Sequence, residues 1–555
     1  MVWQDMKKNN SLNSFSPLFD RPEFSKKEKF LIDPFFTNSD KNAFAVSFLP
    51  PEVIGALCSR TSRAKDDLRG IFLKEFIGPF IEEKSSYGTS LKRLISFFHR
   101  YPVELIFSNP KGREFYVKWL AQYGDDSIAQ MAGAHLIYSS LSQITIKHFE
   151  DMRLGLAPIE KSTRYVDYSS KIKGKYRYYI DPDLEKIGLE KEYKRVMDNL
   201  FDTYTKMVSE YFEELKSHFP DENILVLKAK AYDTVRGLLP MATLSQVAFF
   251  GNGQAFEYLV ARSLDHRLGE IRWAAEAGLV ELEKIIPSFL RRAHGDAAVE
   301  YRDYLNSQKE IPKEFIPQKG IGPKEDVRLI SYDKNGEEAV LAGLIFPAAH
   351  EGFDEIVEHV KRMSTPQKKK LLEKVLSKRH ARWYKVPRAF EHATVAFDIC
   401  MSIGSWRDLH RHRILTQQKE LFTVMHGRTI PPEFEGTRFQ KMYESALDQA
   451  EELFYKIEKK DPVLAQYVVT MSHRVRFVQR QNLRSLFWET ELRTIPQGHP
   501  DYRKVEQKKA DLVKKVYPLI GSFLQVDMND YHFARRGTAE KIKEKEKKLL
   551  AGLKK

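Results

Sequence analysis

The residues best suited to chemistry are three adjacent side chains, Arg411, His412 and Arg413, at the end of an expected short helix. Three potential cations in a row repel one another unless an anion or a flat, electron-rich ring compensates them. A pyrophosphate or a flavin ring could do so, since guanidinium groups offer planar donors and stack on ring faces. The alternative is a solvated basic helix end favoured by the helix dipole. A metal site from His410, His412 and His426 is disfavoured, because the arginines repel a cation and no acidic ligand has matching spacing.

The elements expected around this segment are one strand, entered by Phe390-Glu391-His392, and several helices. Apolar residues alternate along the strand, as they do when one face is buried; they are Val395, Phe397, Ile399 and Met401. An amphipathic helix comes after the basic segment. Its apolar face carries Met442, Ala446, Ala450, Leu453, Phe454 and Ile457. A polar helix with residues 481–484 and 491–493, and a last helix through 512–519, complete this half.

The first half presents a similar order of elements, which indicates an internal repeat. The pieces are residues 127–130, an apolar stretch at 134–139, a loop ending at 161–165, a long amphipathic helix over 193–215, residues 236–240, residues 251–254, the segment from Arg262 to Arg272, and a helix to Arg292. Few strands among many helices indicate an α/β or α+β fold, with a small sheet packed against long helices in each copy.

The chain is too long for one ordinary core, so two or more domains are the default. A stretch rich in proline and glycine divides it nearly in half. The expected parts are an irregular N-terminal extension (1–40), a first domain (41–305), a linker (306–325), a second domain (326–530) and a basic tail (531–555). Two apolar runs around Asn335-Gly336, within 327–346, predict a β-hairpin.

Four pieces of the second half, taken together, resemble the flavin-dependent thymidylate synthase family. In chain order they are Phe390-Glu391-His392, Arg411-His412-Arg413, Asn482-Leu483-Arg484 and Arg493. The gaps from His392 to Arg413 and from Asn482 to Arg493 also match the family pattern. The resemblance covers about 339–526. It implies that Arg411, His412, Arg413, Asn482 and Arg484 bind a flavin and that Arg493 is catalytic. Without the resemblance, His392 is equally well explained as a neutral core histidine.

The first half, from about residue 43 to 294, resembles the same family through different pieces. Arg60-Thr61-Ser62 is similar to an Arg-x-Ser whose serine touches flavin, and Ser162-Thr163-Arg164-Tyr165 to a Ser-x-Arg-Tyr that holds the uridylate. Arg236 precedes a Leu-Pro, as the family's nucleotide-binding arginine does. The resemblance further implies that Arg262 is a catalytic arginine and that His266 lies beside the flavin. Ser62 and His266 are thus expected to bind the cofactor, and Ser162, Arg164 and Arg236 the substrate.

Each half also departs from the family pattern. The first half has Met152-Arg153-Leu154 where Arg-His-Arg is expected, and Asn252-Gly253-Gln254 lacks its arginine. In the second half Thr416 replaces the first motif serine, Leu421 and Thr423 replace the Ser-x-Arg, and Gln466 stands near the expected nucleotide arginine. The second half thus keeps flavin-type residues and the first keeps uridylate-type residues. These losses predict composite sites shared by the two halves; the alternative is that both copies have decayed and the fold serves another purpose.

The resemblance implies an enzyme that converts dUMP to dTMP, with FAD as cofactor and NADPH and methylenetetrahydrofolate as co-substrates. A uracil ring must become electron-rich at C5, and an arginine at N3 or O2 favours this by placing positive charge where negative charge develops. Arg262 and Arg493 are the candidates. Because two copies replace two subunits, a homodimer is expected to reproduce the family's tetramer. The alternative function is a non-catalytic or repurposed flavin- or nucleotide-binding protein, associated with nucleic acid.

The composition is compatible with this expectation. The net charge of +14 favours anionic partners, but solvated surface lysines, as at 368–370 and 541–555, explain much of it. Nucleic-acid binding is not favoured, since no aromatic-interleaved basic strand, zinc pattern or recognition helix is visible. No secretory signal or membrane span is visible either. Cys58 and Cys400 cannot form a disulfide framework and are interpreted as packing residues, so a cytoplasmic protein without a metal is expected.

Overall fold

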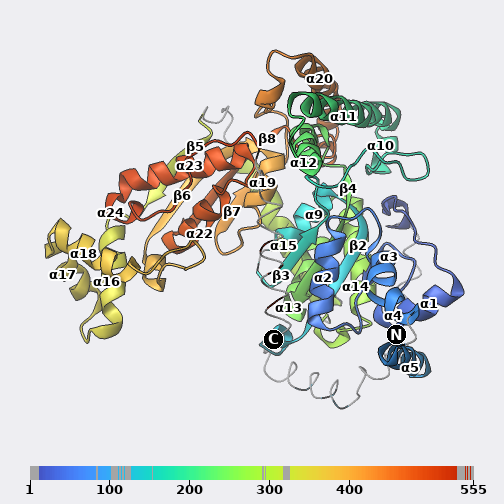
Figure 1. Ribbon diagram of the computed structural model, residues 1–555, viewed down its shortest axis with the longest axis horizontal. Helices are drawn as coiled ribbons and strands as arrows, with labels where there is room; N and C mark the ends of the chain where they lie inside the picture. Colours follow the sequence, from blue (N-terminus) through green and yellow to red (C-terminus); the bar gives the residue numbers. More distant parts are fainter. Residues whose placement is uncertain are drawn as a thin grey trace. The chain divides into compact units, whose positions relative to one another are not determined.

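The computed structural model describes residues 12–82, 85–101, 127–152, 154–290, 293, 295–316 and 325–533, with isolated positions in the remaining segments. Two four-stranded antiparallel sheets organise these residues (Figure 1). The strand order is β1-β2-β4-β3 in the first sheet and β5-β6-β8-β7 in the second. Since the same order occurs twice along the chain, the internal repeat and the mixed α/β class expected from the sequence are confirmed.

The strands of the two sheets correspond one to one. The first sheet contains β1 (Ala43–Ala45), β2 (Gly133–Ser142), β3 (Leu156–Glu160) and β4 (Leu244–Asn252). The second contains β5 (Val327–Tyr332), β6 (Thr394–Ser402), β7 (Thr416–Lys419) and β8 (Arg474–Asn482). In each sheet a long central pair, β2–β4 or β6–β8, is flanked by two shorter strands.

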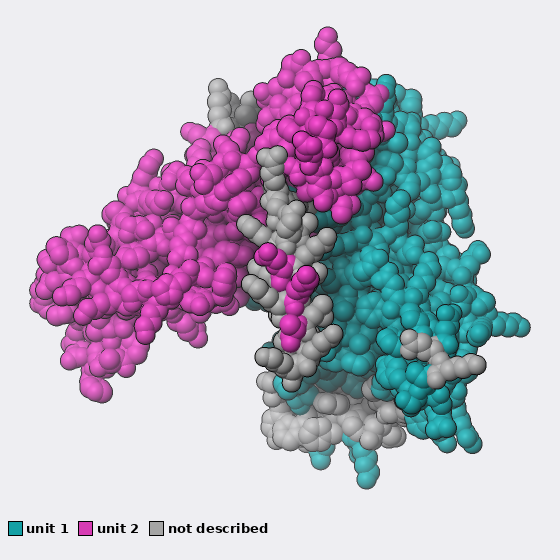
Figure 2. All heavy atoms as spheres, in the orientation of Figure 1, with its two compact units in different colours: residues 1–206, 238–320, 442–469 teal, residues 207–237, 321–441, 470–555 magenta. Residues whose placement is uncertain are grey.

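The chain forms two compact units, each of which takes a segment from the other half of the sequence (Figure 2). Unit 1 consists of residues 1–206, 238–320 and 442–469, and unit 2 of residues 207–237, 321–441 and 470–555. The division falls inside the two longest helices, α11 (Glu190–His218) and α20 (Arg438–Glu458). The sequence predicts two consecutive domains and gives no signal for this exchange of segments.

Unit 1 surrounds its sheet with helices on both faces. The helices are α1 (Lys26–Ile32), α2 (Pro51–Thr61), α3 (Leu68–Ile71), α4 (Gly78–Glu82), α5 (Ser86–Arg100), α8 (Ser127–Met131), α9 (Gln143–Glu150), α10 (Asp183–Lys186), α13 (Gly253–Ser263), α14 (Gly269–Leu282), α15 (Asp296–Glu310) and α21 (Pro462–Ala465). A hydrophobic core joins the segment from α1 to α5 to the sheet and includes Leu57, Phe72 and Ile137. Helix α14 packs on β1 and β2. There Gly278 leaves room for Tyr138, whose hydroxyl lies 2.1 Å from where a Cβ would be.

Unit 2 has a similar sheet with fewer covering elements. Its helices are α12 (Ile224–Val235), α16 (Gly336–Ile345), α17 (Phe353–Arg362), α18 (Thr365–Leu376), α19 (Ile403–Leu409), α22 (Leu483–Arg493), α23 (Pro500–Val516) and α24 (Pro518–Gly521). Helix α23 packs on β5, β6, α19 and α22. The Tyr517 hydroxyl donates to the Asp333 carbonyl at 2.8 Å, and Glu337 accepts hydrogen bonds from the backbone N–H groups of Leu519 and Ile520 at 2.7 and 2.9 Å. These contacts fasten the end of α23 to the segment between β5 and α16.

The hairpin predicted over 327–346 is wrong, because the second apolar run is the helix α16 rather than a strand. Asn335-Gly336 begins this helix, and Glu337 and Glu338 occupy its first turn, where acidic residues favour the helix dipole. The polar stretch at 481–482 likewise ends the strand β8 and does not begin a helix. Its inward residues Gln479 and Gln481 are polar, so the alternation of apolar and polar residues that identifies a half-buried strand is missing.

The two segments expected to be irregular contain helices. Residues 26–32 of the N-terminal extension form α1, and Ser25 and Glu28 cap its N-terminus with a capping box. Helix α15 extends to Glu310, inside the expected linker. Residues 317–324 of that linker, most of the basic tail, and Arg153 lie outside the described residues.

Candidate functional site

The basic segment of unit 2 follows directly after α19, which ends at Leu409. Helix α19 begins at Ser402, whose hydroxyl accepts from the Ser405 N–H at 3.3 Å. His410 is buried and its ring lies 4.5 Å from that of Trp406. Arg411 is exposed, whereas His412 and Arg413 are half-buried. The two arginines thus lie just beyond a helix C-terminus, where the dipole favours cations.

His412 is joined to the predicted catalytic residue Arg493. The Arg493 Nε–H donates to His412 Nε2 at 2.8 Å, and its Nη1 lies 3.8 Å from Asp408 Oδ1. Burial lowers the pKa of His412 to about 3, and the charges of Arg493 and Lys509 act in the same direction. The imidazole is therefore neutral, with its proton on Nδ1. The segment carries two cations around a neutral acceptor rather than three cations.

Arg484 and Asn482 connect two other motif pieces. Arg484 donates from Nη1 to Glu391 Oε1 at 2.7 Å and from Nε to the Val386 carbonyl at 3.0 Å. The hydrogen bond from Arg484 lowers the pKa of Glu391. Asn482 caps α22, since its side chain accepts from the Ser485 N–H at 2.8 Å. Both residues therefore have structural roles in fixing α22 next to the Phe-Glu-His segment.

A fully buried ionic cluster lies in the same unit, and sequence reasoning missed it. Lys509 Nζ donates to Glu489 at 2.7 Å and to Glu506 at 2.9 Å, with all three side chains inaccessible to solvent. Gln479 donates to Glu489 at 2.7 Å. Burial and the neighbouring Glu489 raise the pKa of Glu506, so one carboxyl of the pair is expected to hold a proton. In sequence, Glu506 and Lys509 are three residues apart on a polar helix, which is the spacing of an ordinary surface ion pair.

In unit 1 the structure brings Ser62 and Ser162 together. The Ser162 N–H donates to the Ser62 carbonyl at 3.0 Å, although the two residues belong to segments far apart in sequence. The Ser162 hydroxyl accepts from the Arg164 N–H at 3.2 Å, and the Ser62 hydroxyl donates to the Ser59 carbonyl at 2.8 Å. The expected flavin-type and uridylate-type serines of the first half are therefore neighbours.

Arg262 and His266 lie around the end of α13, also in unit 1. Arg262 Nη2 is 3.6 Å from Asp151 Oδ2, and Nη1 is 3.9 Å from Met152 Sδ. The ring of His266 lies 4.6 Å from that of His148, and its Nδ1 accepts from the Leu268 N–H at 3.1 Å. Where His412 faces an arginine in unit 2, Met152 faces Arg262 here, so the site has no equivalent of the imidazole–guanidinium pair.

The repeat shows that Ser263, not Arg262, occupies the position of Arg493. Asn252 caps α13 as Asn482 caps α22: each side chain accepts a hydrogen bond at 2.8 Å from the backbone N–H three residues later in the chain. The eleventh residue after the cap is Ser263 in one copy and Arg493 in the other. The Ser263 hydroxyl is 3.0 Å from His148 Nε2. His148 is the sixth residue after the cap of its helix, Ser142, as Asp408 is the sixth after Ser402, so His148 and Asp408 are equivalent. Arg262 thus precedes the equivalent position by one residue.

Arg236 of the first half belongs to unit 2. It lies 3.3 Å from Asp233, and its Nε is 3.8 Å from where a Cβ at Gly404 of α19 would be. The Gly237 carbonyl accepts from the Ser472 N–H at 2.9 Å. Conversely, Gln466 of the second half lies in unit 1, where the following Tyr467 donates to Glu270 at 2.9 Å. The three predicted substrate residues are therefore divided, with Ser162 and Arg164 in unit 1 and Arg236 in unit 2.

Two copies of one sheet and one capped helix define a tandem-duplicated α/β protein. The family model described as "Thymidylate synthase complementing protein" matches residues 87–288 and 328–519, once in each repeat. The chain therefore belongs to the thymidylate synthase complementing protein family, and the resemblance predicted from its motifs is confirmed.

Three curated relatives match this chain in sequence over nearly their whole length. A UPF0159 protein of Chlamydia pneumoniae is 34% identical over 535 residues, covering 92% of this chain and 97% of the relative. A UPF0159 protein of Chlamydia muridarum is 34% identical over 531 residues, with the same coverage. A UPF0159 protein of Thermoplasma acidophilum is 30% identical over 521 residues, covering 87% of this chain and 96% of the relative.

The described residues contain neither a membrane-spanning helix nor a metal-binding cluster. None of the helices among them is both long enough and apolar enough to cross a membrane. Within the same ranges, no group of three or more histidine, cysteine, aspartate or glutamate side chains is placed to hold a metal ion.

Proposed function

We propose that the chain is a flavin-dependent thymidylate synthase-like enzyme that methylates dUMP, with its working site in unit 2. The observation that supports this most directly is the exchange of segments. It puts Arg236, a uridylate-type residue of the first repeat, beside α19, whose end carries Arg411, His412 and Arg413 of the second repeat. Unit 2 thus gains a uridylate-type arginine, which the second repeat lacks because Gln466 stands near that position, while Ser162 and Arg164 stay in unit 1.

The side chains of unit 2 suit an anionic, flat cofactor. Arg411 and Arg413 offer guanidinium groups that fit a pyrophosphate, and the neutral His412 between them can donate from Nδ1 without adding charge. FAD bound there, reduced with NADPH, would supply a hydride, and methylenetetrahydrofolate the one-carbon unit. Asn482 caps α22 and Arg484 bonds Glu391, and these two contacts hold α22, the helix that carries Arg493, in place.

Arg493 is the residue proposed to act on the uracil ring. Its Nε–H is held by His412, which fixes the plane of the guanidinium group. A fixed guanidinium at N3 or O2 stabilises the negative charge that develops on the ring as C5 becomes nucleophilic, without reorganisation during the reaction. In unit 1 Ser263 replaces this group, so we propose that unit 1 contributes no catalytic arginine at that position.

The decisive experiment is to assay conversion of dUMP to dTMP by the purified chain with FAD, NADPH and methylenetetrahydrofolate, comparing Arg493→Lys with Arg262→Lys. Lysine keeps the charge but not the planar donors. Loss of one preorganised donor lowers kcat about 10²- to 10³-fold, which we expect for Arg493→Lys. Arg262→Lys should retain activity within about threefold, because Arg262 is outside the equivalent position. Equal losses in both variants would contradict the assignment of roles.

A second candidate is a flavin- or nucleotide-binding protein that has lost catalysis. Ser263, Gln466, Leu421 and Thr423 favour it, since each stands where the family pattern expects a more polar or charged group. A purified protein that is yellow, with the absorbance band of an oxidised flavin, and binds dUMP but forms no dTMP would support this candidate. Light scattering tests the associated expectation of a homodimer, which depends on the analogy between two repeats and two subunits.

A further inference from the structure

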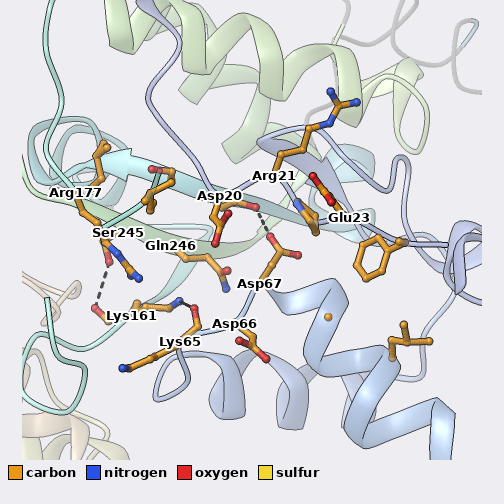
Figure 3. A pocket seen from close by; sticks show the side chains of 18 of the residues that line it. Asp20, Arg21, Glu23, Lys65, Asp66, Asp67, Lys161, Arg177, Ser245 and Gln246 are labelled. Atoms are coloured by element: carbon orange, nitrogen blue, oxygen red, sulfur yellow. Dashed lines mark hydrogen bonds between the residues drawn. The ribbon is translucent and has the colours of Figure 1, made fainter. Parts of the chain in front are cut away.

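A cavity of about 500 Å³ lies within unit 1, among the N-terminal segment, the loop between α2 and α3, and strands β2 and β4 (Figure 3). Its polar lining includes Ser139, Lys161, Arg177, Ser245 and Gln246 on the side of the sheet. Its volume is that of an ordinary small-molecule site, which typically measures about 300–1,000 Å³.

This cavity is separate from the site described above. Twelve residues are predicted from the sequence to bind or react, and none of them lines this cavity. The lining residues from the N-terminal segment and from the α2–α3 loop also lie outside the part of the chain matched by the family model. Lys161 precedes Ser162 in the chain, but the backbone N–H groups of the two residues donate to different carbonyls. The Lys161 N–H donates to the Gln246 carbonyl at 2.8 Å, whereas the Ser162 N–H donates to the Ser62 carbonyl.

Lys161 is an ammonium group buried at the cavity wall. Only 6% of the residue is exposed, and its Nζ donates to the Lys65 carbonyl at 3.0 Å. Within the described part of the chain, no carboxylate lies at ion-pair distance from it. Burial, followed by the charge of Arg177, lowers the pKa of Lys161 to about 8. An uncompensated buried cation is costly, and an anion in the cavity would remove that cost.

Arg177 and Gln246 leave further hydrogen-bonding capacity at the same wall. Arg177 lines the cavity and donates from Nη2 to the Ser170 hydroxyl at 2.8 Å. Gln246 is 6% exposed, and no described residue hydrogen-bonds its side-chain amide, which lines the cavity (Figure 3). A buried ammonium group, a guanidinium group and an amide that no described residue hydrogen-bonds thus lie at one cavity wall, which is the lining expected for a polar, anionic ligand.

Five acidic residues also line the cavity: Asp20, Glu23 and Glu28 of the N-terminal segment, and Asp66 and Asp67 of the loop between α2 and α3. Asp66 is paired with Lys74 at 2.8 Å, and Asp67 with the fully buried Arg69 at 2.9 Å. Asp67 also accepts a hydrogen bond from Ser139 at 2.5 Å. Asp66 and Asp67 act on Lys161 through their charge, but their ion-pair partners are Lys74 and Arg69 rather than Lys161 or Arg177.

We propose that this cavity binds a small molecule through an oxyanion group, a carboxylate or a phosphate, which Lys161 and Arg177 hold while the Gln246 amide bonds a neutral polar group of the same molecule. The site does not depend on the proposed thymidylate synthase activity. Its ligand would add negative charge beside the two cations and would give the Gln246 amide a hydrogen-bond partner.

The test is calorimetric titration of the full-length chain with inorganic phosphate and, separately, with acetate, at constant ionic strength maintained with chloride. We expect one of the two anions to bind the unmodified chain. Lys161→Met and Arg177→Met should each weaken its dissociation constant about ten- to a hundred-fold, because each removes a charge-assisted contact. Lys74→Met is the matched control: it removes the same charge from the same cavity at a lysine already paired with Asp66, so affinity should stay within about threefold.

Two further outcomes decide the proposal. Methionine is similar in length to lysine and removes a desolvated charge, so Lys161→Met should unfold at the same temperature as the unmodified chain or higher, which separates lost binding from lost folding. The bound anion should also slow acylation of Lys161, followed by peptide mass spectrometry. Binding of the anion with equal affinity to Lys161→Met, or no binding of either anion to the unmodified chain, would overturn the proposal.

Discussion

Arg493 donates from Nε to Nε2 of His412, a contact that requires Nε2 to be an acceptor and therefore fits a neutral imidazole. A protonated imidazole would have no acceptor for that N–H and would face a second positive charge. Sequence reasoning identified the residues of this pair but counted the histidine as a potential cation. The sequence does not reveal its neutrality, because the pKa of His412 is lowered by burial and by the charges of Arg493 and Lys509, which lie far along the chain.

The first prediction at this scale concerns acid stability. The pKa of His412 is about 3 in the folded chain, below the value of about 6.5 expected when unfolded. Between these two values the unfolded state binds a proton that the folded state does not, so the free energy of unfolding should fall as the pH falls from about 6.5 toward 3. His412→Gln cannot titrate and keeps an acceptor for Arg493, so its stability should depend less on pH in this window.

Urea unfolding at pH 7 and pH 5 measures the effect. His359→Gln is the control, since His359 is exposed on α17 and the substitution removes a histidine without disturbing a buried contact. If His412→Gln and the unmodified chain lose the same stability between the two pH values, His412 is not held neutral by its surroundings.

At the scale of elements, the helices with a clear apolar stripe were predictable and the strands with polar inward residues were not. The long helices α11 and α20 and the alternating strand β6 agree with the sequence pattern. Strand β8 was missed because Gln479 and Gln481 face inward toward Glu489. The cavity of unit 1 was also beyond prediction: Lys161 and Gln246 have no distinguishing pattern, and only the pairing of β3 with β4 brings them together.

The matched caps Asn252 and Asn482 allow structural and ligand-binding roles to be separated. Both side chains accept at 2.8 Å, so Asn252→Ala and Asn482→Ala should each lower the free energy of unfolding by about 1 kcal/mol. If Asn482 also contacts flavin, as the family resemblance implies, only Asn482→Ala should lose bound flavin, measured by absorbance after gel filtration. Loss of flavin from both variants, or from neither, would reduce Asn482 to a helix cap.

At the scale of the whole molecule, each unit is completed by a segment from the other half of the sequence. In unit 1 the N–H groups of Met241 and Ala242 donate to the Val469 and Tyr467 carbonyls at 2.7 and 3.0 Å. Tyr467 also donates to Glu270, a fully buried carboxyl whose pKa is raised by burial. These interactions are made by residues 442–469, which belong to the second repeat. The duplication has therefore produced units that neither half can complete alone.

The last prediction follows from this exchange. Residues 1–320 expressed alone lack the segment 442–469, so Glu270 loses Tyr467 and two backbone donors lose their acceptors. Each buried polar group left unsatisfied costs about 1–3 kcal/mol, which is a large fraction of the stability of a typical domain. Residues 321–555 alone lack the segment 207–237 and with it Arg236. We therefore expect neither half to unfold cooperatively in urea, and mixed or co-expressed halves to form a complex that does.

The control is the full-length chain cleaved at an introduced protease site near residue 320, which should retain the unfolding transition of the intact chain. Tyr467→Phe in the intact chain should lower stability by about 1–3 kcal/mol by removing the Glu270 contact alone. If residues 321–555 alone unfold cooperatively and convert dUMP to dTMP, the first repeat supplies nothing to the site and the exchange of segments has no role in function.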